Sequence, residues 1–94
     1  MKFRYVITYG KLTSTLMEST LEEITEELAR HKKEAEKYGV KVLFWGSPWG
    51  VSEGLVIVYD SGESLDNYTK FMEAMTRARK QPFTDGRSNI VLEW

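Results

Sequence analysis

The stretch Gly54-Leu55-Val56-Ile57-Val58-Tyr59 is the strongest strand signal in the chain, and the other elements can be placed outward from it. Branched aliphatic and aromatic residues favour extended backbone, and Asp60-Ser61-Gly62 directly after them predicts a turn. Before it, Val40 to Trp45 is a second apolar run, which Gly46-Ser47-Pro48-Trp49-Gly50 interrupts. The two runs therefore predict two strands joined as a long hairpin.

A helix is expected on each side of this hairpin in the sequence. Thr20 and Glu23 have the spacing of a capping box, in which a hydroxyl and a carboxylate satisfy free amide groups at a helix start. The first helix is predicted from about Leu21 to Tyr38 and the second from about Ser64 to Lys80, because apolar residues recur there at helical spacing. Pro82 follows the second helix, where a helix cannot continue.

The two ends of the chain carry the remaining strands. Phe3 to Tyr9 alternates large apolar with smaller or polar residues, which predicts a first strand ended by Gly10. Residues 11–19 lack periodicity and are expected to form a loop over one end of the sheet. Asp85-Gly86 is typical of a turn, and Ser88 to Trp94 is predicted to be the last strand.

This order is β-α-β-β-α-β, the ferredoxin-like α+β arrangement, in which two helices cover one face of a four-stranded antiparallel sheet. The 94 residues are enough for one core, and no shift in composition divides the chain. Residues 1–94 are therefore predicted to form a single ferredoxin-like domain.

Composition argues against several classes of function. The absence of cysteine excludes thiolate metal sites, and the single histidine argues against a histidine-based one, so any metal would need carboxylate ligands; no metal and no cofactor are expected. A net charge of -1 with both signs interspersed argues against nucleic-acid binding. No apolar run approaches the roughly 20 residues that span a bilayer, so no membrane partner is expected. The N-terminal residues are typical of a strand rather than a signal peptide, which predicts a cytoplasmic protein.

Two helices cover only one side of such a sheet, so the composition of the other side indicates its partner. Phe3, Tyr5, Ile7, Tyr9, Leu55, Ile57, Tyr59, Ile90 and Leu92 are expected to face the helices. The uncovered face is then predicted to carry Arg4, Val6, Thr8, Val56, Val58, Asn89, Val91 and Glu93, joined from the second strand by either Leu43 and Trp45 or Val42 and Phe44. This face is apolar enough to predict a homodimer that packs two sheets together, with Arg4 and Glu93 paired in the interface. The alternative is a monomer with a half-polar sheet.

A family resemblance rests on His31 in the first helix, Lys37-Tyr38-Gly39 at its end, and the strand that closes as Leu43-Phe44-Trp45-Gly46-Ser47-Pro48. Over nearly its whole length the chain resembles the dimeric α+β barrel superfamily, and this motif is similar to the YciI-type pattern. Members include cofactor-independent monooxygenases, muconolactone isomerases and haem-degrading enzymes. The haem-degrading members carry their histidine on the second helix, so the resemblance implies no haem here.

His31 is the candidate acid or base, with Tyr5 or Tyr9 as an orienting donor, because an imidazole near phenols in an enclosed pocket can exchange a proton near neutral pH. The alternative is a core histidine that hydrogen-bonds to a tyrosine hydroxyl or a backbone carbonyl. Trp45, Trp49 and Tyr59 are the candidate walls of a pocket for a small, partly aromatic molecule, although large rings equally suit a core. Two functions follow: a monooxygenase-like or isomerase-like enzyme without cofactor, or a non-catalytic ligand-sensing or dimerisation module.

Overall fold

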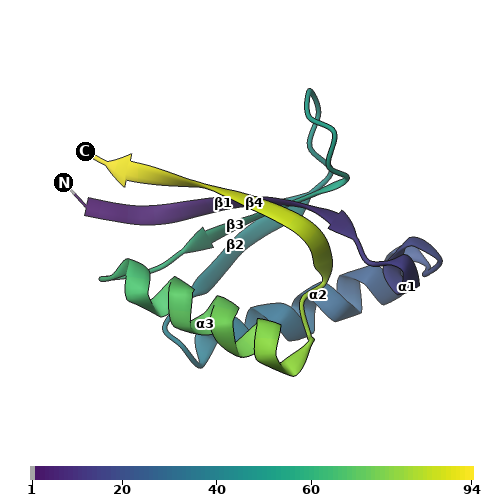
Figure 1. Ribbon diagram of the computed structural model, residues 1–94, viewed down its shortest axis with the longest axis horizontal. Helices are drawn as coiled ribbons and strands as arrows, with labels where there is room; N and C mark the ends of the chain where they lie inside the picture. The colour runs from purple at the N-terminus through teal and green to yellow at the C-terminus, as the bar shows by residue number, and fades with distance from the viewer. Residues whose placement is uncertain (1) are drawn as a thin grey trace.

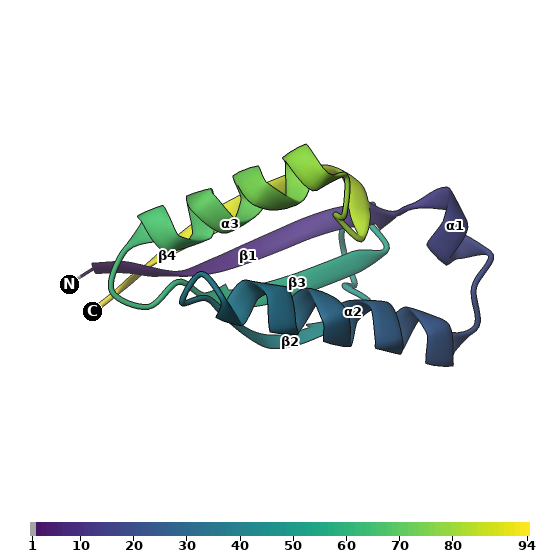
Figure 2. The ribbon, with the colours of Figure 1, turned by 90° about the horizontal axis from the view of Figure 1, so that it is seen from below.

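The computed structural model describes residues 2–94 and has an α+β fold, as predicted. Its elements in chain order are β1 (Lys2–Leu12), α1 (Ser14–Met17), α2 (Leu21–Glu36), β2 (Lys41–Gly46), β3 (Leu55–Asp60), α3 (Leu65–Ala78) and β4 (Phe83–Glu93). The strands form one antiparallel sheet in the order β2-β3-β1-β4. The helices α2 and α3 lie side by side across one face, whereas α1 lies beyond one end of the sheet (Figures 1 and 2).

Both long helices begin where their capping residues predict. The Thr20 hydroxyl accepts a hydrogen bond from the amide of Glu23, whose carboxylate accepts one from the amide of Thr20, so the predicted capping box is confirmed. The hydroxyl of Ser64 caps α3 by accepting a hydrogen bond from the amide of Asp66. The helix α3 ends at Arg79, whose left-handed backbone (φ 54°) turns the chain back across the end of the helix.

The predicted assignment of the two sheet faces is wrong for β1. Val6 pairs with Tyr59 and Thr8 with Ile57, and all four side chains are buried beneath the helices. Tyr5, Ile7 and Tyr9 therefore lie on the uncovered face. Both alternating sets in β1 contain apolar residues, so periodicity alone cannot choose between them. The space under the helices already holds Tyr59, Phe71 and Leu28, and in a close-packed layer the smaller β1 side chains fit there.

A bulge in β2 settles which of its residues reach the uncovered face. Val42 pairs with Tyr59 and Trp45 with Ile57, so both lie on the helix side, while Phe44 pairs with Val58 on the uncovered side. The predicted alternatives both required strict alternation, and the irregularity at Leu43 removes it.

Asp85 and Gly86 do not form the predicted turn. The strand β1 continues past Gly10 to Leu12, and Asp85 and Gly86 lie inside β4 at an irregularity in its pairing with β1. The ring of Phe83 packs directly on two glycines there: a Cβ at Gly10 would lie 2.6 Å from Phe83 Cβ, and one at Gly86 would lie 2.6 Å from Phe83 Cε2. Residues 11–19, predicted to be a loop, complete β1 and form α1, which Thr13 caps.

None of the helices within residues 2–94 is long and apolar enough to cross a membrane.

Candidate functional site

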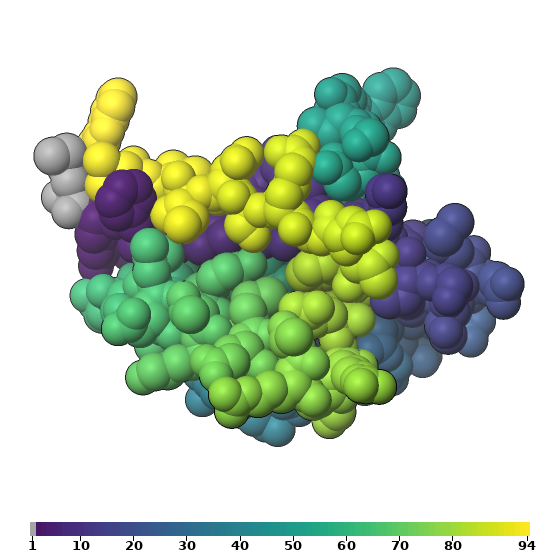
Figure 3. All heavy atoms as spheres, viewed as in Figure 1, coloured from purple at the N-terminus to yellow at the C-terminus, as the bar shows by residue number. Residues whose placement is uncertain are grey.

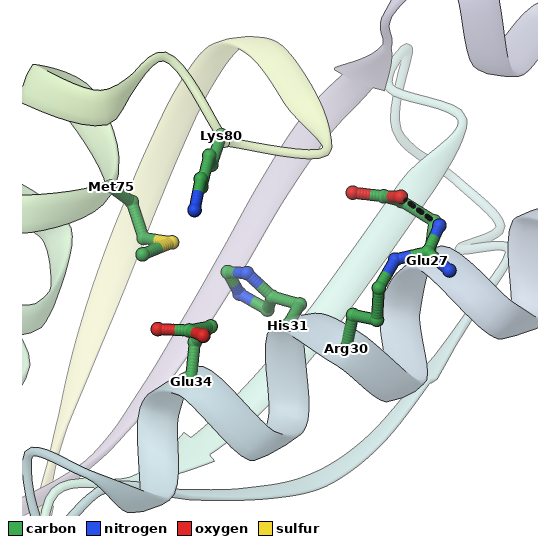
Figure 4. A pocket seen from close by; sticks show the side chains of 6 residues that line it. All are labelled: Glu27, Arg30, His31, Glu34, Met75 and Lys80. Carbon is green, nitrogen blue, oxygen red and sulfur yellow. Dashed lines mark hydrogen bonds and ion pairs between the residues drawn. The ribbon is translucent and has the colours of Figure 1, made fainter.

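A cleft opens between α2 and the C-terminal end of α3 (Figure 4). It has a volume of about 230 Å³. The residues that line it are Glu27, Arg30, His31, Glu34, Met75 and Lys80. Figure 4 shows that four of them come from successive turns of α2, while Met75 comes from the last turn of α3 and Lys80 from the segment just after this helix. Segments far apart in the sequence thus meet around the one histidine of the chain.

His31 lies at the bottom of this cleft and is only 4% exposed. Its Nε2 lies 2.7 Å from the hydroxyl of Tyr59 on β3. The centroid of its ring is 5.0 Å from that of Phe71 and 5.8 Å from that of Tyr59. The imidazole is therefore held in one orientation by packing on two elements and by a hydrogen bond on one edge.

The other edge of the imidazole has no protein partner. His31 Nδ1 is buried and makes no hydrogen bond to any group in residues 2–94. The Tyr59 hydroxyl, also fully buried, has no second partner within that range. If Nε2 carried the proton, both the phenol proton and Nδ1 would be left without partners. The arrangement with fewer unmatched groups has Tyr59 donating to Nε2 and the proton on Nδ1.

Burial keeps both groups of this pair neutral. Loss of solvation lowers the pKa of His31 from 6.5 to about 4, and the nearby negative charge of Glu27 opposes this only in part. Burial also raises the pKa of Tyr59 well above its ordinary value. Near pH 7 the pair therefore consists of a neutral phenol and a neutral imidazole, whose Nδ1–H is a donor without a protein partner in residues 2–94.

Some of the charged side chains that line the cleft form ion pairs within the protein, and one does not. Arg30 is paired with Glu27 along α2. Lys37 Nζ lies 2.9 Å from Glu34 Oε1, and this contact lowers the pKa of that carboxyl. Lys80 makes no ion pair within 4 Å among the described residues. In Figure 4 its amine is directed into the cleft toward His31.

The structure does not bring the other predicted catalytic residues to His31. Tyr5 and Tyr9 lie on the uncovered face of the sheet, with the sheet itself between them and α2. The hydroxyl of Tyr5 donates to Glu93, and the ring of Tyr9 lies under Arg87 at 4.5 Å. The phenol that does contact His31 is Tyr59, which the sequence analysis placed in a pocket wall.

The three predicted pocket residues are also separated. Tyr59 lies in the core, whereas Trp49 is 96% exposed near the tip of the β2–β3 loop. Trp45 packs against the core and lines a different, smaller cavity of about 140 Å³ beside the first turns of α2. No aromatic box is formed by these side chains within residues 2–94.

The uncovered face keeps part of the predicted dimer surface. Val56, Val58 and Val91 lie there, because they pair with Tyr9, Ile7 and Tyr5 respectively. Val6 was predicted to lie with them, but it is fully buried in the core. Phe44 joins the face and is 58% exposed.

A cluster of ion-paired side chains occupies one end of this face. Arg4 donates two hydrogen bonds of 2.8 Å to Asp60 and lies 3.9 Å from Glu93 within the same chain. The guanidinium holds the pKa of Asp60 below its ordinary value. At the other end Arg87 pairs with Glu53 of the β2–β3 loop. Figure 3 shows the C-terminal end of β4 and this loop rising at the two ends, with a lower surface between them.

Sequence reasoning found His31 but missed most of its surroundings. Glu27 and Glu34 are four residues before and three after it, a spacing that places all three on one side of a helix. Lys80 could not be found this way, because only the turn at Arg79 directs it toward α2. A cluster of hydroxyls was also missed: Thr8 Oγ1 lies 2.8 Å from both Tyr68 Oη and Ser88 Oγ.

Comparison of the sequence with protein-family models and with curated proteins gave no match. The likeness to YciI-type proteins therefore rests on the short motif alone. No cluster of three or more His, Asp or Glu residues suited to hold a metal occurs in the part of the chain that the structure describes.

Proposed function

We propose that this protein is a small-molecule-binding homodimer of the ferredoxin-like, dimeric α+β barrel type, with its ligand site in the cleft between α2 and α3. The observation that carries the ligand site is the unmatched Nδ1 of His31. Buried polar groups in folded proteins are nearly always hydrogen-bonded, and one without a protein partner marks the place of a water or a ligand. Because His31 lines a cleft of about 230 Å³, there is room beside this residue for more than one water.

Binding without catalysis is the better supported of the two predicted functions. A general acid or base works best with a pKa near the operating pH, whereas burial lowers the pKa of His31 to about 4. No carboxylate in residues 2–94 hydrogen-bonds to the ring to reverse this effect. The site therefore suits recognition of a ligand by a neutral donor better than proton transfer.

The second copy is proposed to dock on the uncovered sheet face. Tyr5, Ile7, Phe44, Val58 and Val91 form an apolar centre there, and such a face favours association over exposure to water. In a two-fold dimer the same patch meets itself, so a patch of one sign of charge would repel its copy. On this face Asp60 is already paired with Arg4 at one end and Glu53 with Arg87 at the other. The charges at each end are therefore balanced within one chain, and two copies of the face do not repel each other.

The ligand site is tested by recording ¹⁵N-histidine NMR spectra during a screen of small polar and aromatic compounds. With a single histidine, the imidazole signals report on one site. We expect at least one class of compound to shift the Nδ1–H signal. If every compound leaves it unchanged, the cleft holds only water and the proposed binding function is wrong.

The dimer is tested by light scattering at micromolar concentration. We expect twice the chain mass for the natural protein, and the chain mass for Val58→Glu, because a carboxylate at the centre of the interface would be buried without a partner. The matched control is Met17→Glu on α1, where the side chain is 72% exposed and away from the sheet face. A natural protein that remains monomeric would rule out this interface.

A further inference from the structure

Two residues that line the cleft, His31 and Lys80, each carry a hydrogen-bond donor without an acceptor among residues 2–94. These donors are His31 Nδ1, which is buried, and the amine of Lys80, which makes no ion pair within that range. From this pair we infer that the ligand is a small monocarboxylate, whose oxygens accept hydrogen bonds from His31 Nδ1 and Lys80 Nζ. The inference rests on the proposed function and specifies the class of its ligand.

The charges around the cleft favour a single negative charge on the ligand. Glu27 is paired with Arg30 and Glu34 with Lys37. Lys80 makes no ion pair of its own in residues 2–94 and acts on Glu34 only through its nearby charge, which helps to lower the pKa of that carboxyl. A carboxylate ligand would neutralise the charge of Lys80 and would satisfy the imidazole donor at the same time. A phosphate carries more charge and would approach Glu27 and Glu34 as well, which opposes its binding.

The size and walls of the cleft limit the rest of the ligand. The cleft has a volume of about 230 Å³. In liquid water about seven or eight molecules occupy this volume, at about 30 Å³ each, so the cleft has room for an acid of the size of benzoate. The thioether of Met75 forms an apolar wall opposite α2, and sulfur packs well against aromatic rings. The carboxylate would thus lie toward His31 and Lys80, and the apolar part toward Met75.

The test compares benzoate with benzamide, which has the same shape and no charge, and with inorganic phosphate. Each is titrated into the ¹⁵N-histidine-labelled protein while the Nδ1–H signal of His31 is followed. We expect benzoate to shift this signal and to bind at least about tenfold more tightly than benzamide, since a charge-assisted hydrogen bond is lost in the amide. Equal affinity for benzamide, or tighter binding of phosphate, would overturn the assignment of a carboxylate.

Two lysine variants separate the cleft from general charge effects. Lys80→Met should weaken benzoate binding about tenfold and leave benzamide unchanged, because it removes the amine and keeps the length of the side chain. Lys32→Met removes the same charge from an exposed position on α2 outside the cleft and should leave both affinities unchanged. Equal weakening by the two variants would contradict a specific role for Lys80.

Failure of this inference can be told apart from failure of the proposed function. If benzamide or another uncharged compound shifts the His31 signal and benzoate does not, the cleft binds ligands of a different class. If no compound of any class shifts it, the binding function fails as well.

Discussion

Acid should destabilise this protein through His31 before it protonates the carboxylates. In the folded state burial lowers the pKa of His31 to about 4, whereas the unfolded chain restores the ordinary value of 6.5. Between these two pH values the unfolded state binds a proton that the folded state excludes, so the free energy of unfolding falls as pH falls. The contribution of His31 to stability is complete above pH 6.5 and is lost as pH approaches 4.

The magnitude follows from the two pKa values. At about 1.36 kcal/mol for each pKa unit, the difference between 6.5 and about 4 corresponds to about 3 kcal/mol of stability. A domain of this size is stable by about 5 to 15 kcal/mol in total, so the effect is large enough to measure. The groups that face the imidazole are Glu27, Arg30, Glu34, Tyr59 and Lys80.

The assay is urea unfolding followed by tryptophan fluorescence at a series of pH values from about 7.5 down to about 4.5, for the natural protein and for His31→Phe. The variant loses the hydrogen bond to Tyr59 and should be less stable than the natural protein near neutral pH, but its own stability should change little in this range. The carboxylates with lowered pKa, such as Asp60 and Glu34, contribute to stability above their ordinary pKa values and lose that contribution at lower pH, as pH falls through their folded values. Both proteins contain these carboxylates, so their effect cancels when the free energy of unfolding of the variant is subtracted from that of the natural protein.

Two results would refute this reasoning. One is a parallel loss of stability in the natural protein and the variant across this range. The other is an NMR titration in which His31 takes up its proton with a midpoint near 6.5, which would show an imidazole open to solvent.

Two further predictions concern the fold. Thr20→Ala should lower the free energy of unfolding by about 1 kcal/mol, because the amide of the capping box loses its acceptor, and Thr25→Ala in the exposed part of the same helix should not; equal urea midpoints for both would contradict the role of the cap. Gly10→Ala should destabilise the protein and displace the Phe83 ring, because the new Cβ would lie 2.6 Å from Phe83 Cβ. Gly54→Ala, which has open space around it, is the control, and thermal unfolding with near-ultraviolet circular dichroism compares the two.

The elements with strong local signals were predictable, and the candidate site was predictable only in part. The start of α2 and the bounds of the hairpin strands β2 and β3 lie within one or two residues of those predicted, because caps and branched apolar runs act over short distances. His31 was identified because a polar residue interrupts the apolar stripe of α2. Its contact with Tyr59 joins positions 28 residues apart, and no local pattern encodes such a pairing.

The sequence by itself determined the order of the four strands and the two long helices, since each depends on periodicity and caps within a short segment, whereas the short helix α1 was missed. Only the tertiary structure decided which face of β1 is covered and which groups surround His31. The physical reason is that Val6 and Tyr5 are both acceptable in a strand, and the volume left beneath α2 and α3 chooses between them. In the same way, the turn at Arg79 and the packing of α3 on the sheet bring Lys80 to the cleft, so that the charge and the unmatched donor meet only in the folded chain.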